Sequence, residues 1–491
     1  MQLLLCFCTM LCAPMFQQSE TGKPTKATVA TTNAATRIDN YLTKGVEQGF
    51  SGAVLIAKDG KIVLNKGFGL ANKEQSLPIS PDTVFSTGSV TKQFTATAIL
   101  KLSEQKKLSV SDPLSRFFPN LPDDKKQITL HQLLTHSAGF VGSIGDGDFD
   151  HVPRDQFFKR LFKTRLRSEP GKKHNYSNAG YSILGRVVEL ASGQDYETYL
   201  YEQLFKPAGM EQTGYLRPKW NEAELAHGYR VNFMPMGTLI ERFKNDGKIS
   251  WNLKGNGGIH STNQDMYKWY KALKNNTILS PAQTKTLTTP YIAEQESGDS
   301  HYAYGWAIFK SRRDTKIVSH NGGNGVFFHD FLWLTEENTV IILSTNAASR
   351  ETEVAWKIEK MLFDETYQPE PIKKNVYQLV LDFASKNPPA ESAKLKTALE
   401  KGYSSQLASP VTLNRIGYVI LKSNQNLEWA VEVFKLNTEF FEKDGNSWDS
   451  LGDGYLAIGN TDEAIKSLKK AVELKAEGSN RKLQRLLKSD K

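Results

Sequence analysis

A serine and a lysine three residues apart, Ser89 and Lys92, are the side chains of this sequence best placed for covalent chemistry. A helix is predicted here because apolar residues recur at the helical period: Val90, Phe94, Ala98 and Leu102. A serine in the first turn of a helix lies beside unpaired N–H groups and the positive end of the dipole, which favour an alkoxide. The lysine falls on the same helix face and can supply the base that a serine nucleophile needs. A capped surface helix would show the same pattern.

Two later segments carry polar residues of the kind that would complete such a site. Tyr176 and Asn178, in YSNAGY, directly precede an amphipathic stretch that predicts a helix. His320, in VSHNGG, lies at the end of a predicted strand and is followed by Gly322 and Gly323. Each residue alone also has a structural interpretation: the tyrosine as cover for the core, the asparagine as a helix cap, the histidine as a strand-end residue.

Taken together, SVTK, Tyr176-x-Asn178 and His320-x-Gly322 resemble the three active-site motifs of the penicillin-recognising serine hydrolases. Their order and wide spacing are similar to those of class C β-lactamases, D-alanyl-D-alanine carboxypeptidases and related esterases. The resemblance covers roughly residues 34–365 and extends to three further segments, at 128–140, 255–269 and 304–309.

The resemblance implies a role for each motif residue. Ser89 would be the acylated nucleophile, and Lys92 would take or relay its proton. Tyr176 would be the general base and acid that carries protons to the leaving group. The remaining motif residues would bind the substrate, namely Asn178, His320 and Gly322, while the backbone N–H groups of Ser89 and Gly323 would form the oxyanion hole.

The third motif has a histidine where the β-lactamases have a lysine that docks the substrate carboxylate. A histidine with its ordinary pKa of about 6.5 is mostly neutral at pH 7 and offers little charge attraction. The predicted function is therefore an exported serine hydrolase with a Ser89 acyl-enzyme, acting on the carbonyl of a D-amino-acid peptide, an ester or a β-lactam. The alternative is a non-catalytic sensor of peptidoglycan or peptides.

No metal or other cofactor is predicted. The residues that come nearest to metal-ligand pairs are His131 with His136 and His329 with Asp330, and neither pair has the spacing that zinc sites show. His136, in LLTHSAG, is interpreted as a residue that stabilises a turn.

Composition places the chain among soluble globular proteins of two or three domains. It has 491 residues, of which 39% are hydrophobic and 23% charged. The net charge of +9 is spread without a block of Lys or Arg, so binding to nucleic acid is not predicted.

All three cysteines lie in the apolar opening segment, at Cys6, Cys8 and Cys12. Residues 1–18 are predicted to be a signal peptide and residues 19–33 a linker, which implies a periplasmic or secreted protein. A buried N-terminal strand is the other interpretation, and lipidation of Cys12 would make the protein membrane-associated. No later stretch is long and apolar enough for a transmembrane span.

Residues 34–368 are predicted to form an α+β domain of the β-lactamase/transpeptidase-like fold, with one antiparallel sheet flanked by helices and a helical insert. A hairpin with an Asp59-Gly60 turn begins the sheet. Strands at 303–309, 315–320, 326–334 and 339–345 complete it, and a helix at about 351–363 closes the domain.

After Pro369-Glu370-Pro371 the strand patterns stop, and residues 372–491 are predicted to be an all-α domain. Two tetratricopeptide repeats are predicted, at about 411–444 and 445–478, and a protein partner would bind through them. The residues that fit the repeat are Trp448, Leu451, Gly452, Tyr455, Ala464, Leu468 and Ala471. A plain helical bundle is the alternative.

Overall fold

The computed structural model describes residues 26–145, 147, 150–243, 248–424 and 426–489. The predicted signal peptide, residues 1–18, and the first part of the predicted linker lie outside these ranges. Helix α1 (Lys26–Val46) begins within the segment predicted to be a linker, so the rest of that segment is helical. Within the described ranges, no helix has the length and apolar character needed to cross a membrane.

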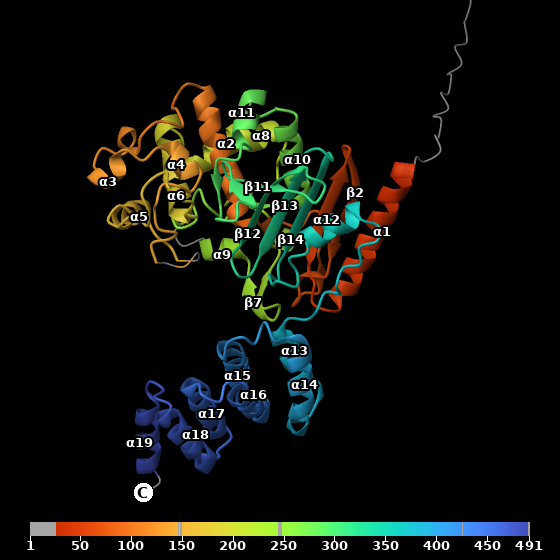
Figure 1. Cartoon of the computed structure of the whole chain (residues 1–491), viewed down its shortest axis with the longest axis vertical. Helices are drawn as coiled ribbons and strands as arrows, with labels where there is room; N and C mark the ends of the chain where they lie inside the picture. Colours follow the sequence, from red (N-terminus) through yellow and green to blue (C-terminus); the bar gives the residue numbers. More distant parts are fainter. Residues whose placement is uncertain (1–25, 146, 148–149, 244–247, 425, 490–491) are drawn as a thin grey trace, which may run out of the picture.

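One antiparallel sheet of eight strands forms the centre of the first domain (Figure 1). Its order is β2–β1–β14–β13–β12–β11–β10–β9, so strands from the two ends of the domain are neighbours. The strands are β1 (Gly52–Lys58), β2 (Lys61–Phe68), β9 (Ile292–Ala293), β10 (Ser300–Tyr302), β11 (Ala307–Lys310), β12 (Lys316–Gly323), β13 (Phe328–Leu334) and β14 (Thr339–Thr345).

Two connections between neighbouring strands show how local sequence directs the sheet. Asp59 and Gly60 have φ values of 51° and 76°, and the predicted hairpin of β1 and β2 is confirmed. The single strand predicted at 303–309 is wrong. Gly305 has a φ of 75° in a turn there, and only Ala307–Lys310 is a strand.

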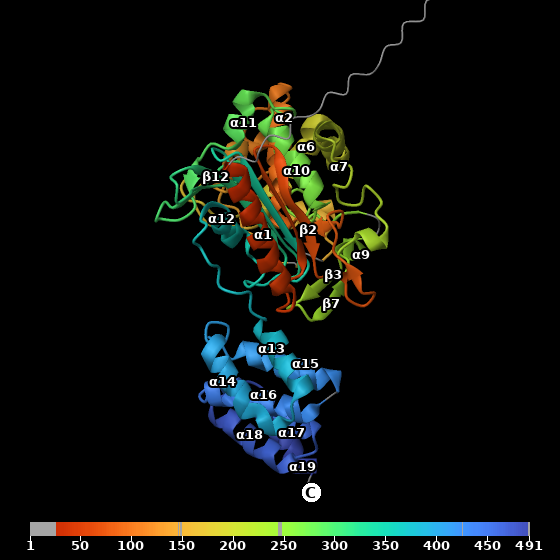
Figure 2. The same ribbon diagram turned by 90° about the vertical axis from the view of Figure 1, so that its right-hand side faces the viewer.

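Helices cover both faces of the sheet. Helices α1 and α12 (Ala355–Phe363) pack on one face, as Figure 2 shows for α1, and α10 (Asn263–Lys274) packs against β1 and β14 on the other. Side chains of β1 alternate between two cores, with Val54 and Ile56 beneath α1 and Leu55 on the opposite side. Because both faces of the sheet are covered at its centre, β1 and β14 are mostly apolar along their whole length.

The residues between β2 and β9 form the helical insert. Helices α2 (Thr91–Glu104) and α6 (Asn178–Ser192) pack against each other at its centre, and α2 is buried on nearly all sides. Its other helices are α3 (Asp123–Lys126), α4 (Leu130–Leu134), α5 (Arg154–Leu161), α7 (Tyr196–Leu200), α8 (Lys206–Ala208), α9 (Leu239–Phe243) and α11 (Pro281–Leu287). Its short strands are β3 (Leu70–Asn72), β4 (Leu77–Pro78), β5 (Phe85–Ser86), β6 (Gly228–Arg230), β7 (Met234–Gly237) and β8 (His260–Ser261).

The C-terminal part, as far as the structure describes it, consists of helices. They are α13 (Val376–Lys386), α14 (Ser392–Gly402), α15 (Val411–Ser423), α16 (Leu427–Phe440), α17 (Gly445–Ala457), α18 (Thr461–Glu473) and α19 (Ser479–Ser489). The starts of α15, α17 and α19 are 34 residues apart, which is the tetratricopeptide period. A Cβ atom on Gly417 would lie 2.4 Å from the Phe434 ring, so paired helices approach closely at this glycine.

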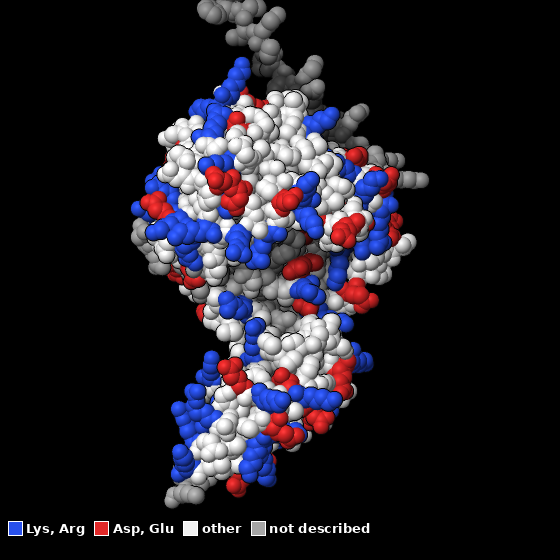
Figure 3. Space-filling model, turned by 60° about the vertical axis from the view of Figure 1, so that its left-hand side comes forward, with Lys and Arg blue, Asp and Glu red and all other residues white. Residues whose placement is uncertain are grey.

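The two domains contact each other below β7 (Figure 1). Asn375 donates a hydrogen bond to the Val231 carbonyl at 2.7 Å, and Asn232 donates one to Gln378 at 2.9 Å. Ile372 is buried in the core beneath α1, so packing of the first domain continues through the predicted boundary at residue 371. On the face shown in Figure 3, acidic and basic side chains are interspersed.

Candidate active site

Ser89 lies in a 3₁₀ turn, Gly88–Val90, that leads directly into α2. The turn requires the glycine, because Gly88 has a φ of 51° and an added Cβ would lie 2.8 Å from the Gly322 carbonyl carbon. Ser89 itself is half-buried, whereas its neighbours on both sides are buried. The hydroxyl group is therefore held at a fixed place and remains open to a substrate.

Lys92 is fully buried one turn later on α2. Its Nζ donates hydrogen bonds to Ser89 Oγ at 3.1 Å, to Asn178 Oδ1 at 2.7 Å and to the Asn256 carbonyl at 2.7 Å. The same nitrogen lies 4.8 Å from the centre of the Tyr176 ring. Three acceptors from three segments fix the amine beside the serine oxygen.

Tyr176 reaches Ser89 from the start of α6. Its side chain is 38% exposed, yet its hydroxyl group hydrogen-bonds to Ser89. Desolvation of this hydroxyl raises the pKa of Tyr176 above its ordinary value; the hydrogen bond from Ser89 opposes the rise and the charge of Glu294 adds to it. At neutral pH the residue is therefore a phenol, which can donate a proton to a leaving group.

The turn around His136 holds the tyrosine segment in place. His136 has a φ of 56°, its carbonyl accepts from Asn175 N–H at 2.7 Å, and its Nδ1 accepts from Ser177 N–H at 3.1 Å. Its ring lies 4.2 Å from the Tyr176 ring, between centroids. Burial, together with the charge of Lys92, holds its pKa well below 6.5, so the ring is neutral. These contacts fit a turn-stabilising residue.

His320 lies in the wall of the site, on β12, with both ring nitrogens engaged by protein groups. Nδ1 donates to the Asn321 carbonyl at 2.6 Å, which leaves Nε2 to accept from the Tyr302 hydroxyl at 2.9 Å. Burial, reinforced by the Lys92 charge, lowers its pKa to about 3. His320 thus has no free N–H for a substrate in this arrangement.

The two glycines after His320 differ in their surroundings. A Cβ on Gly322 would lie 2.1 Å from the Thr87 carbonyl oxygen and 2.5 Å from the Ser89 nitrogen. A Cβ on Gly323 would come no nearer than 3.6 Å to any atom, so the backbone is crowded at Gly322 and not at Gly323. The close approach brings the backbone of β12 beside the serine turn, where the N–H groups of Ser89 and Gly323 can share one oxyanion.

A small pocket opens beside the serine, and no described residue that lines it is charged. Its lining consists of Ser86, Gly88, Ser89, Asn178, Leu239, Leu253, Asn256, Gly257, Gly258, Gly323 and Asn324. Within the described part of the chain, no group of three or more His, Cys, Asp or Glu side chains could hold a metal ion. The arrangement can perform acyl transfer to a serine, with small acyl groups.

Two residues of the site were not predicted. Asn256 is buried and contacts Lys92 through its backbone carbonyl, with its own amide fixed by Ser182 Oγ at 2.8 Å. Tyr302 is buried and contacts His320. Asn256 lies in GNGG, within the segment 255–269 that carries part of the family resemblance, and this is the one feature of the sequence that points to it.

Comparisons with known proteins identify the family to which the chain belongs. The family model described as Beta-lactamase matches residues 38–361. PbpX of Bacillus subtilis (strain 168) is 35% identical over 274 residues, which are 56% of this chain and 66% of PbpX, just under two thirds of its length. The teichoic acid D-alanine hydrolase of Staphylococcus aureus is 26% identical over 310 residues, covering 63% of this chain and 73% of that protein. The crystal structure of a penicillin-binding protein from Bacillus halodurans superposes with a TM-score of 0.56 at 27% identity, covering 65% of this chain and 96% of that one.

Proposed function

Because the chain belongs to the beta-lactamase family of serine hydrolases, we propose that it hydrolyses the amide or ester of a small D-amino acid through an acyl-enzyme on Ser89. The observation that carries the proposal is the set of contacts at Lys92: its Nζ lies 3.1 Å from Ser89 Oγ and 4.8 Å from the centre of the Tyr176 ring, so a serine, an amine and a phenol meet at one place. An adjacent base and an adjacent acid are what a serine nucleophile needs.

Acylation begins once the Lys92 ammonium of the resting site has given a proton to solvent. The neutral amine keeps two N–H bonds for Asn178 and the Asn256 carbonyl, and its lone pair faces Ser89 Oγ. Ser89 Oγ then attacks the substrate carbonyl and gives its proton to this amine. The negative oxygen that forms accepts hydrogen bonds from the backbone N–H groups of Ser89 and Gly323, and such fixed donors are worth about 3 kcal/mol each. Tyr176 then gives its phenolic proton to the leaving nitrogen or oxygen as the bond breaks. The resulting phenolate lies beside the newly formed Lys92 ammonium.

In the deacylation step, the Tyr176 phenolate takes a proton from a water molecule, whose oxygen attacks the acyl carbon. The bond to Ser89 Oγ breaks, and this oxygen recovers its proton from the Lys92 ammonium. Both side chains return to their starting forms, so no separate carboxylate base is needed.

The choice of substrate follows from the absence of charge around the pocket. No described lining residue is cationic, and His320 is neutral with both nitrogens engaged, so a substrate carboxylate gains little attraction there. This favours D-aminoacyl esters and amides over β-lactams. The relative named as a teichoic acid D-alanine hydrolase supports the same substrate class.

A hydrolysis panel tests the proposal. D-alanine p-nitrophenyl ester, D-alanine p-nitroanilide and a chromogenic cephalosporin are compared, with Ser89→Ala as the blank. We expect turnover of the ester and amide that Ser89→Ala abolishes, and a lower kcat/KM for the cephalosporin. Equal turnover by wild type and Ser89→Ala would overturn the mechanism.

We also propose that the protein is exported, to the periplasm or the cell exterior, as the opening segment predicts and as cell-wall relatives support. The helical domain would recruit a protein partner through its repeats, because their 34-residue spacing is typical of peptide-binding arrays. A non-catalytic sensor remains the alternative function, and it predicts labelling of Ser89 by an acylating probe without turnover.

A further inference from the structure

A second cavity, of about 1300 Å³, lies across the loop that holds Lys92. The loop residues Leu253 and Asn256 line the active-site pocket, whereas Trp251 and Lys254 line this cavity. The other walls are the start of α5, the end of α6, helix α7 and the segment 211–219. The two spaces share no described lining residue, so the second cavity is not an extension of the active site.

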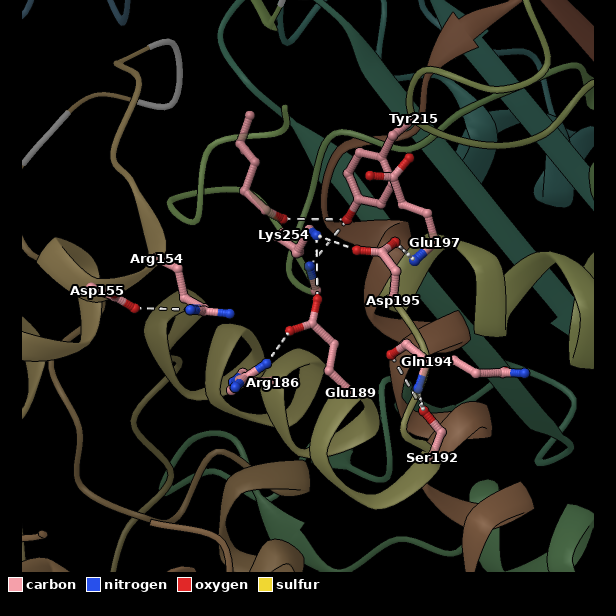
Figure 4. A network of polar contacts seen from close by, with 12 residues as sticks. Arg154, Asp155, Arg186, Glu189, Ser192, Gln194, Asp195, Glu197, Tyr215 and Lys254 are labelled. Carbon is pink, nitrogen blue, oxygen red and sulfur yellow. Dashed lines mark hydrogen bonds and ion pairs between the residues drawn. The ribbon is translucent and has the colours of Figure 1, made fainter. Parts of the chain in front are cut away.

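Charged side chains of both signs line this cavity, and the segment 211–219 adds Arg217 and Lys219 to them. Figure 4 shows Arg154, from α5, on one side and Asp195 and Glu197, from the start of α7, on the other, with Lys254 and Glu189 between them. Arg154 is about half exposed and its only ion pair among the described residues is with its neighbour Asp155, at 2.9 Å. Its guanidinium group therefore retains donors for an anion.

The side chains of Lys254 and Glu189 are almost fully buried, whereas that of Asp195 is more than half exposed. Lys254 Nζ lies 3.4 Å from both Glu189 and Asp195, and Glu189 also accepts a bond from Arg186 at 2.7 Å. Glu197 forms no ion pair among the described residues, and its carboxylate accepts a hydrogen bond from the Leu216 backbone. Desolvation, the largest effect, raises the pKa of Glu197; Asp195 adds to the rise, and the charges of Lys254 and Arg217 oppose it without cancelling it. A cation supplied by a ligand would offset the free-energy cost of keeping this carboxylate ionised in the cavity.

We propose that this cavity binds a short zwitterionic peptide, whose ammonium group pairs with Glu197 and Asp195 and whose carboxylate pairs with Arg154. The volume is above that of an ordinary small-molecule pocket, which suits a dipeptide or larger peptide. The rings of Tyr215 and Trp251, both buried, are part of the cavity lining and add apolar surface to it.

Occupancy of the cavity is transmitted to Lys92 through three consecutive residues. Lys254 faces the cavity, the Gly255 N–H donates to the Tyr215 hydroxyl at 3.1 Å, and the Asn256 carbonyl accepts from Lys92 at 2.7 Å. A peptide that draws Glu197 or Lys254 toward itself therefore shifts the backbone that positions the active-site amine. Tyr215 is a positioning residue in this chain of contacts.

Binding is tested by calorimetry on Ser89→Ala, so that no probe is consumed. The probes are D-alanyl-D-alanine, its N-acetyl derivative, which lacks the ammonium, and its amide, which lacks the carboxylate. We expect the zwitterion to bind at least about tenfold more tightly than either derivative, and Glu197→Gln or Arg154→Ala to remove that preference. Lys159→Ala, an exposed change on α5 outside the cavity, is the matched control. Equal binding of all three probes, or an unchanged preference in both cavity variants, would overturn the proposal.

Coupling is tested by turnover of a neutral ester with and without the peptide. We expect the peptide to change kcat by about fivefold or more in wild type, and Tyr215→Phe to keep peptide affinity but lose this change. An equal change in Tyr215→Phe would overturn the coupling. Because binding is measured without catalysis, failure of the proposed hydrolase activity would leave the binding result interpretable.

Discussion

Gly322→Ala tests whether the end of β12 must touch the serine turn for catalysis. The new Cβ would lie 2.1 Å from the Thr87 carbonyl oxygen and 2.5 Å from the Ser89 nitrogen, both backbone atoms. Relief of this overlap requires the strand and the turn to separate by at least about 1 Å, a misplacement that typically lowers a rate by about 10²-fold. Overpacking of this kind also destabilises a fold by about 1–3 kcal/mol.

The assay is the rate of acylation by a fluorophosphonate probe, with kcat/KM for the ester and the thermal unfolding midpoint measured in parallel. Gly323→Ala is the matched control, since its Cβ would come no nearer than 3.6 Å to any atom and its backbone N–H is retained. We expect Gly323→Ala to keep its acylation rate within about threefold of wild type. Acylation of Gly322→Ala at the wild-type rate would show that the oxyanion hole does not depend on this contact.

Further predictions concern the proton-transfer groups, two pH dependences and the domain boundary. Ser89→Ala should abolish probe labelling, and Tyr176→Phe should lower kcat by about 10²–10⁴-fold at an unchanged unfolding midpoint; a smaller loss would remove Tyr176 as the acid. His320 has its pKa lowered from 6.5 to about 3, so the folded state binds fewer protons there than the unfolded chain and stability should fall as the pH drops from 6.5 toward 3. His320→Gln should reduce this acid slope in urea titrations, and an unchanged slope would contradict the assignment. Burial raises the pKa of Asp330 from 3.8 to about 8, so the unfolded chain loses this proton first and stability should fall as the pH rises from about 4 to 8; Asp330→Asn should flatten that decline. A chain ending at residue 374 should fold and keep its ester turnover, whereas one ending at 371, without the buried Ile372, should unfold at a lower temperature; equal midpoints would place the boundary earlier.

The sequence predicts those parts of the site whose residues lie close together in the chain. Ser89, in the 3₁₀ turn that leads into α2, is three residues before Lys92 on α2, and Tyr176 and Asn178 lie at the start of α6, so their types and spacing alone carry the pattern. The sheet is predictable for a similar reason, because turns such as Asp59-Gly60 separate apolar runs.

The remaining parts depend on contacts between distant segments. Asn256 acts through its backbone carbonyl, a group that every residue has, so its type gives no sign of the contact with Lys92. Tyr302 is one of 18 tyrosines, and only the pairing of strands places it beside His320. The approach of β12 to the serine turn determines that Gly322, and not Gly323, is the crowded glycine. Side-chain direction and close backbone approach are set by tertiary structure.

The pairing of β1 with β14 also has a consequence for how the chain is made. Ile56 pairs with Ile341, which is synthesised nearly 300 residues later. During synthesis the β1–β2 hairpin therefore forms early, but the edge of β1 that pairs with β14 stays open until almost the whole domain has been made. Until then β1 presents unpaired N–H and C=O groups beside an apolar run, which is a surface that other chains can join. This hairpin is therefore the surface that a chaperone would bind first. A nascent chain arrested before residue 339 lacks β14 and is expected to aggregate through the hairpin.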